Sequence, residues 1–160
     1  MYGDNIFESS DYSKLTKNHK TKTDKKFKFI DLSSNQYKKY INDELQTNID
    51  DWVNKEGKIG EIAICTNDNK YAGHVIIGTK GNSKGVLCSL FVDPNYRGRG
   101  LSDILVEDAI HKYSAIEVGV YADNAIGIKL YESHGFVKIR EFMYYNELVY
   151  VMRLKDYITL

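Results

Sequence analysis

Residues 86–110 constrain the fold of this chain more than any other segment. The apolar run VLCSLFV (86–92) predicts a buried strand, and the only proline, Pro94, follows it in a turn. The chain continues as RGRGLS (97–102), and helical spacing of apolar residues begins at once. A strand, a glycine bend and a helix N-terminus together bind phosphates through main-chain N–H groups. We therefore expect an anion site in this segment.

Two common phosphate loops do not match this bend. A nucleoside triphosphate loop needs a lysine after its last glycine, where this chain has Leu101. A dinucleotide fingerprint needs a third small residue, and that position is the acidic Asp103. Arg97 and Arg99 can add charge-assisted hydrogen bonds to an anion that the glycines allow to approach closely.

The remaining patterns predict one mixed α/β domain. A first strand is predicted to begin near Phe27. Further apolar runs predict strands over 61–66, 71–79, 86–92 and 116–122, and a closing pair of strands within 136–154. Helical spacing predicts helices over 34–55, in one or two pieces, and over 101–113 and 125–134. Gly57 and Gly60 are predicted to stop the first of them. The order β-α-β-β-β-α-β-α-β-β indicates a sheet whose early strands are antiparallel.

A second motif follows the strand at 116–122. Its pattern is Asn-x5-Leu-Tyr-x3-Gly-Phe, formed by Asn124, Leu130, Tyr131, Gly135 and Phe136. Taken singly, Asn124 is an N-cap, Tyr131 is a core aromatic of an amphipathic helix, and His134 is a favourable helix C-terminal residue. These residues gain a functional interpretation only as a set, because all of them occur at the spacing of one motif and this motif follows the bend at 97–102.

With both motifs in order, the chain resembles the GNAT superfamily of acetyl-CoA-dependent N-acetyltransferases over about residues 27–155. It departs from the family pattern at Ser102, where glycine or alanine is usual, and at Gly127, where alanine is usual. The resemblance implies a central, mostly antiparallel sheet of six to seven strands, about four helices, and a splay between strands 86–92 and 116–122. It also implies a catalytic domain over 27–160. Residues 1–26 lie outside the resemblance; their few aliphatic residues and many Ser, Thr, Asn and Lys residues predict a polar, lysine-rich and partly disordered tail.

The resemblance also assigns the cofactor site. It implies acetyl-CoA as co-substrate and no metal. Pantetheine would lie in the splay against the main chain of Leu90, Phe91 and Val92. The pyrophosphate would lie on the bend formed by Arg97, Gly98, Arg99, Gly100, Leu101 and Ser102, and Asn124 and Tyr131 would complete the set. Tyr131 would be the general acid for the leaving thiolate, because a phenol near pKa 10 can protonate a thiolate near pKa 8.5.

The base that takes the proton of the amine is not assigned. Family members often carry a carboxylate on the strand before the bend, but 86–92 has no acid and Ser89 stands in that position. Glu61, His74 and, through a water molecule, Tyr121 are the candidates. An acceptor that is already neutral would need no strong base.

Acceptor identity is not encoded in a motif. The resemblance places the acceptor site between the 34–56 segment and the loop joining the last two strands, where Trp52, Tyr144, Tyr145 and Glu147 specify no substrate. Acidic residues of the first helical segment could attract a cationic amine, but a solvated helix face explains them as well: Asp43, Glu44, Asp50 and Asp51.

Composition narrows the classes further. The chain carries 22 basic and 22 acidic residues, which disfavours a nucleic-acid binder, although the lysine-rich tail keeps that as a minor alternative. No apolar run approaches the ~18 residues of a membrane span, and no signal peptide is visible, so a cytoplasmic protein is expected. Cys65 and Cys88 lie in apolar runs and lack metal-site spacing, which predicts buried reduced thiols.

These observations favour an N-acetyltransferase that moves an acetyl group to a primary amine of a small molecule, peptide or protein. Two alternatives stay open. One is an enzyme that uses another acyl-CoA, and the other is a coenzyme A-binding module without turnover, which the missing strand carboxylate favours. A homodimer is in keeping with the family.

Overall fold

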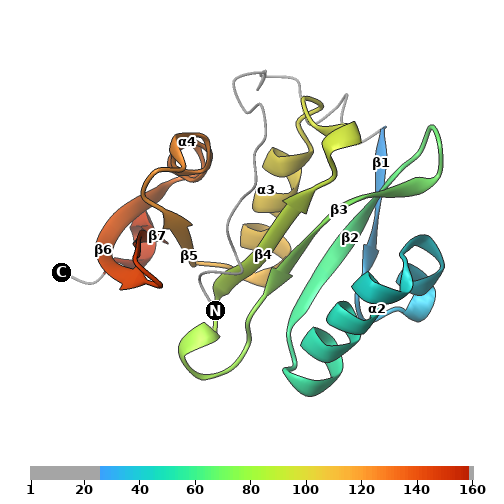
Figure 1. Cartoon of the computed structure of the whole chain (residues 1–160), viewed down its shortest axis with the longest axis horizontal. Coiled ribbons are helices and arrows are strands. Elements are labelled where there is room, and N and C mark those ends of the chain that lie inside the picture. The colour runs from blue at the N-terminus through green and yellow to red at the C-terminus, as the bar shows by residue number, and fades with distance from the viewer. Residues whose placement is uncertain (1–25, 159–160) are drawn as a thin grey trace.

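A computed structural model describes residues 26–158 as a single seven-stranded sheet in the order β1-β2-β3-β4-β5-β7-β6 (Figure 1). The only parallel neighbours are β4 and β5, and every other pair is antiparallel. The strands are β1 (Phe27–Asp31), β2 (Ile59–Cys65), β3 (Lys70–Ile77), β4 (Val86–Val92), β5 (Glu117–Tyr121), β6 (Phe136–Tyr144) and β7 (Glu147–Leu154). The predicted mixed fold is confirmed.

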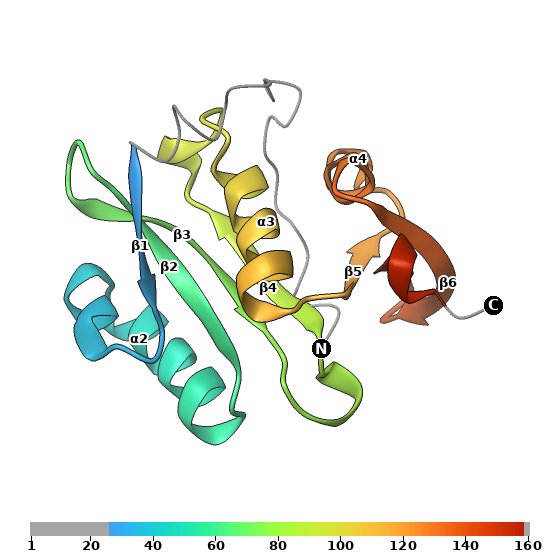
Figure 2. The same cartoon turned by 180° about the vertical axis from the view of Figure 1, so that it is seen from behind.

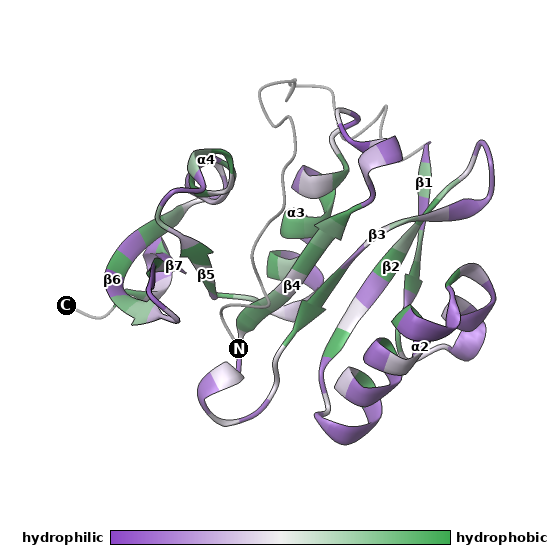
Figure 3. Ribbon diagram, viewed as in Figure 1, coloured by the Kyte–Doolittle hydropathy of each residue, from purple (hydrophilic) through white to green (hydrophobic). Residues whose placement is uncertain are grey.

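Helices cover both faces of this sheet (Figure 1, Figure 2). They are the 3-10 helix η3 (Asn35–Tyr40), α2 (Asp43–Asp50), the π-helical turn η4 (Asp51–Lys55), α3 (Leu101–Tyr113) and α4 (Ala125–Ser133). One core cluster joins the sheet to α3 and α4, and a second joins the opposite face to η3 and α2. Apolar residues accordingly run along β4 and β5, while polar residues cover much of α2 (Figure 3).

The first helical segment is more broken than a single apolar face suggests. Asn42 ends the 3-10 turn and starts α2, because its side chain accepts a hydrogen bond from the Leu45 N–H at 2.8 Å. Gly57 has a φ of +67° and follows η4, which confirms the predicted stop. Gly60 is not a stop. It lies within β2, where a Cβ would meet the Val75 carbonyl oxygen at 2.0 Å.

The predicted splay is confirmed in the strand register. β4 and β5 pair only at Val86 with Glu117 and at Leu87 with Val118. Directly afterwards β4 carries one residue more than β3, since Ile77 pairs with Leu87 and Ile76 with Ser89. Such a bulge bends a strand and increases its twist. From residue 88 onward β4 therefore has no ladder partner on its β5 side.

The expected tail over 1–26 lies outside the described residues, apart from Lys26, whose carbonyl accepts a hydrogen bond from the Thr66 N–H at 2.8 Å. Cys65 and Cys88 are buried and free, as predicted. Among the helices of residues 26–158, none has the length and apolar character that crossing a membrane requires.

Candidate active site

The glycine bend lies between the end of β4 and the start of α3. Gly98 and Gly100 have φ angles of 77° and 80°, in the left-handed region that glycine adopts without strain. Gly100 is the N-cap of α3, so the bend leads straight into the helix end that carries positive partial charge. Arg97 Nε donates a 3.0 Å hydrogen bond to the Val92 carbonyl, which holds the bend against β4.

The second motif lies on α4. Asn124 caps this helix by accepting the Gly127 N–H at 2.9 Å, which confirms its structural role. Tyr131 is completely buried and its ring packs edge-on against Phe136 at 5.8 Å between centroids. Burial raises the pKa of Tyr131 above its ordinary value, so the hydroxyl keeps its proton at neutral pH.

His134 joins the two motif-bearing helices, a contact that sequence analysis missed. Its Nε2 lies 2.9 Å from Asp103 and its Nδ1 lies 2.6 Å from Glu107, both on α3. Burial opposes the charged form of His134, but the two carboxylates outweigh burial and raise its pKa. As predicted, His134 also caps the C-terminus of α4. We call His134, Asp103 and Glu107 the α3–α4 clamp.

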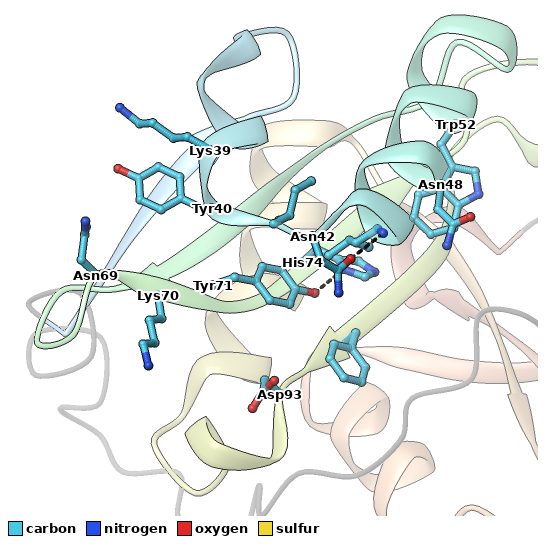
Figure 4. A pocket seen from close by; sticks show the side chains of 13 residues that line it. Lys39, Tyr40, Asn42, Asn48, Trp52, Asn69, Lys70, Tyr71, His74 and Asp93 are labelled. Atoms are coloured by element: carbon cyan, nitrogen blue, oxygen red, sulfur yellow. Dashed lines mark hydrogen bonds between the residues drawn. The ribbon is translucent and has the colours of Figure 1, made fainter.

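A pocket of about 920 Å³ lies on the α2 face of the sheet, beside the end of β4 (Figure 4). Its central wall is aromatic, formed by Tyr40, Trp52, Tyr71, His74 and Phe91. Lys39, Asn69 and Lys70 lie at one end, where the side chains of Lys39 and Lys70 point away from each other, and Trp52 and Asn48 lie at the other end (Figure 4). Asp93, which directly follows β4, contributes a carboxylate.

A buried histidine forms part of this wall. His74 is 5% exposed, and its Nδ1 lies 2.7 Å from the Tyr71 hydroxyl while its Nε2 lies 2.9 Å from Ser89 Oγ. Burial lowers the pKa of His74 to about 4, so the ring is neutral at pH 7. In either neutral tautomer one ring nitrogen donates and the other accepts. Tyr71, His74 and Ser89 therefore form a continuous hydrogen-bonded chain, which we call the Tyr-His-Ser chain.

The other two base candidates lie elsewhere. Glu61 contacts Lys112 Nζ and the Tyr113 hydroxyl of α3, each at 3.3 Å, on the face of the sheet away from the pocket. Burial, followed by the nearby Asp108, raises the pKa of Glu61 to about 8. Tyr121 is half-buried at the end of β5 and packs with the α2-side core. Of the three candidates, only His74 lines the pocket.

The expected acceptor region is only partly brought together. Trp52 lines the pocket, whereas Tyr144, Tyr145 and Glu147 do not. The acidic residues of the first helical segment stay outside it as well, and Asp50 accepts a hydrogen bond from the Tyr37 hydroxyl at 2.5 Å. Sequence reasoning missed Tyr71 and Asp93. The signal that could have found Asp93 was its place directly after the strand that the resemblance assigns to the thioester.

Comparisons with known proteins agree with this geometry. The family model described as "Acetyltransferase (GNAT) family" matches residues 27–136. A search of curated proteins gives no significant match. The described residues contain no cluster of histidine, cysteine, aspartate and glutamate that could hold a metal ion.

Solved structures share the fold at low sequence identity. A Desulfovibrio desulfuricans protein assigned to the GNAT family has 16% identity and a TM-score of 0.57, with 80% of this chain and 98% of that chain covered. A chimera of spermidine N-acetyltransferase SpeG from Vibrio cholerae and hSSAT has 13% identity and a TM-score of 0.56, with 81% and 95% covered. The NatC complex bound to Gag peptide and CoA has 20% identity and a TM-score of 0.56, with 80% and 96% covered.

A family match over most of the domain, together with the splayed sheet and the glycine bend, defines the class of this protein. The chain belongs to the acetyltransferase (GNAT) family and is an acyltransferase.

Proposed function

We propose that this chain transfers an acetyl group from acetyl-CoA directly to a primary amine of a small molecule, peptide or protein. The observation that carries the proposal is the short β4–β5 pairing, which ends at Leu87 and leaves one side of β4 without a ladder partner next to the glycine bend. The solved structures of similar fold include a spermidine N-acetyltransferase and a complex bound to a peptide and CoA.

The unpaired side of β4 suits an extended, amide-containing cofactor. In the proposal, pantetheine lies along Leu90, Phe91 and Val92 as an added strand would. The pyrophosphate lies on the bend, where Gly98 and Gly100 allow close approach and the start of α3 favours negative charge. The remaining cofactor contacts that we propose come from Arg97, Arg99, Leu101, Ser102, Asn124 and Tyr131.

The chemical step is an acyl transfer that balances without a further reagent. The amine nitrogen attacks the thioester carbonyl carbon, so an N–C bond forms and the C–S bond breaks. A main-chain N–H on the unpaired side of β4 would polarise that carbonyl oxygen. The Asp93 N–H bonds to a carbonyl of β3, so alternation along the strand directs the N–H groups of Leu90 and Val92, rather than that of Phe91, to the unpaired side. The leaving thiolate would take a proton from Tyr131, whose raised pKa keeps the hydroxyl protonated at neutral pH until the thiolate forms. The amine loses one proton, so the overall proton count is unchanged.

We propose the Tyr-His-Ser chain as the path for the proton that the amine loses. Tyr71 would accept it while passing its own proton to Nδ1 of His74, 2.7 Å away. The low pKa of His74 leaves a lone pair on this ring at pH 7. Ser89 would hold the opposite ring nitrogen, in the position where family members often carry a carboxylate.

Turnover measured by thiol release tests the function. The purified chain, acetyl-CoA and a panel of primary amines are expected to release coenzyme A only when an amine is present. Calorimetry with acetyl-CoA alone should show binding. Binding without thiol release from any amine would overturn the proposal in favour of a non-catalytic module, and faster release from a longer acyl-CoA would overturn the choice of acetyl.

A further inference from the structure

The residues that line the pocket beside β4 favour some classes of amine acceptor over others. This inference rests on the proposed function. We propose that the acceptor is an amine on an apolar or aromatic body that also carries an anionic group, either a carboxylate or a phosphate. Lys39 and Lys70, two exposed side chains on opposite sides of one end of the pocket (Figure 4), would attract that group by their positive charge. A polyamine is the acceptor that this arrangement excludes.

The aromatic wall calls for an apolar body. The ring of His74 has Trp52, Tyr71 and Phe91 around it, at centroid distances of 5.8, 6.2 and 5.9 Å. A cavity of about 920 Å³ falls within the range of small-molecule sites. Flat or branched apolar groups bury well against such rings, whereas the thin chain of a polyamine would leave much of the wall in contact with water.

The cationic end calls for an anion. Lys39 Nζ lies 5.5 Å from the centre of the Tyr40 ring, so its charge lies at the outer rim of the pocket. Among the described residues, no carboxylate forms a salt bridge with the side chain of Lys39 or Lys70. The acid nearest in sequence to Lys70 is Asp68, whose carboxylate is bonded to the Tyr96 hydroxyl and the Lys70 main-chain N–H. The hydrogen bond from Tyr96 and, to a smaller extent, the charge of Lys70 lower the pKa of Asp68, so Asp68 offsets part of the Lys70 charge.

Among the described residues, one carboxylate lines the pocket, and it would attract the amine of the acceptor. Asp93 follows β4 directly, close to the Phe91 main chain where the thioester is proposed to lie. An incoming ammonium group is attracted there before it loses its proton. Two ammonium groups against one carboxylate repel a ligand with several positive charges and attract one that pairs an amine with an anion.

Matched acceptor pairs test the anionic group. Benzylamine is compared with 4-(aminomethyl)benzoate for the carboxylate, and tyramine with O-phosphotyramine for the phosphate, with spermidine as the polycation. In at least one pair, the anionic member is expected to have a kcat/KM about tenfold higher than its neutral partner, about 1.4 kcal/mol of selectivity. The pair that shows the larger ratio identifies the group. Spermidine is expected to be the poorest acceptor.

Lysine variants test the assignment to Lys39 and Lys70. Lys39→Gln and Lys70→Gln are each expected to lower the ratio of anionic to neutral kcat/KM about threefold, because the two lysines share the roughly tenfold preference. Lys38→Gln is the matched control, because it removes the same charge from the same 3-10 helix without lining the pocket. Thermal melting of each variant shows that it is folded.

The outcomes separate two failures. Equal turnover within both pairs, preference for spermidine, or ratios that persist in both lysine variants would overturn the acceptor class while leaving the acetyltransferase intact. Binding of acetyl-CoA without acetylation of any amine would overturn the proposed function, and this inference with it.

Discussion

Tyr131 is the residue whose substitution tests the proposed proton donation most directly. It is completely buried, and burial raises its pKa, so it enters the reaction as a protonated phenol. Tyr131→Phe keeps the ring and removes the acid. We expect kcat to fall by about 100-fold, while the Kd for acetyl-CoA changes less than about threefold. Tyr157→Phe, an exposed tyrosine far along the chain, is the control. An unchanged kcat in Tyr131→Phe would remove this residue from the mechanism.

Because His74 is buried, the free energy of unfolding is expected to fall as the pH is lowered. The pKa of His74 is about 4 in the folded state and about 6.5 when unfolded, so the unfolded chain binds this proton first as pH falls. The stabilisation is present above pH 6.5 and is lost as pH falls toward 4, by about 3 kcal/mol in all. Urea unfolding at pH 7 and pH 5 should show a smaller loss in His74→Gln than in the parent. Equal losses would contradict a buried neutral ring.

At the scale of elements, the α3–α4 clamp holds the helix of the second motif against the helix that begins at the glycine bend. The raised pKa of His134 means that its stabilisation is full below pH 6.5 and is lost as pH rises through the folded value. His134→Gln should therefore cost about 1–3 kcal/mol at pH 6 and distinctly less at pH 9, measured by urea unfolding.

A second histidine on the same carboxylate provides the comparison. His111 Nε2 lies 3.5 Å from Glu107, but its side chain is 70% exposed. Such a surface pair contributes little, so His111→Gln should change stability by less than about 0.5 kcal/mol at either pH. If His134→Gln proved equally mild at pH 6, the clamp would have no structural role.

The elements with local signals were predictable, and the contacts between elements were not. The apolar run of β4, the glycines of the bend and the LYxxxGF pattern of α4 each act within a few residues, so their places were found from sequence. The clamp joins residues 103, 107 and 134, and the Tyr-His-Ser chain joins residues 71, 74 and 89. Such pairs depend on how the sheet and helices pack, which a single sequence does not specify.

Backbone irregularities escaped prediction for a related reason. The π-helical turn η4 and the extra residue of β4 opposite Ile76 and Ile77 carry no residue type that marks them. The acceptor pocket is formed by the first helical segment together with β3 and β4. Sequence analysis therefore could not show that Lys39 and Lys70 line the same cavity.

The whole molecule consists of two parts of one sheet that meet at two β4–β5 register positions, at the clamp, and in the core cluster shared by α3 and α4. In the proposal, acetyl-CoA contacts both parts, because the bend belongs to one and Tyr131 to the other. A ligand that binds only the folded state stabilises it by about 2.7 kcal/mol at 100 times its Kd. For a chain of this size we expect acetyl-CoA to raise Tm by about 5–10 °C.

A pair of glycine variants separates loss of the cofactor site from loss of stability. Gly100 (φ 80°) and Gly81 (φ 55°) both adopt the left-handed conformation, so alanine strains either one by about 1–2 kcal/mol and lowers Tm without ligand. Gly81 has no other atom within 4 Å of an added Cβ, and it lies far from the bend in the chain. Gly81→Ala should therefore keep the full rise in Tm with acetyl-CoA. Gly100→Ala should lose most of that rise, since its Cβ and altered backbone disturb the proposed pyrophosphate site, and equal rises in the two variants would place the cofactor away from the bend.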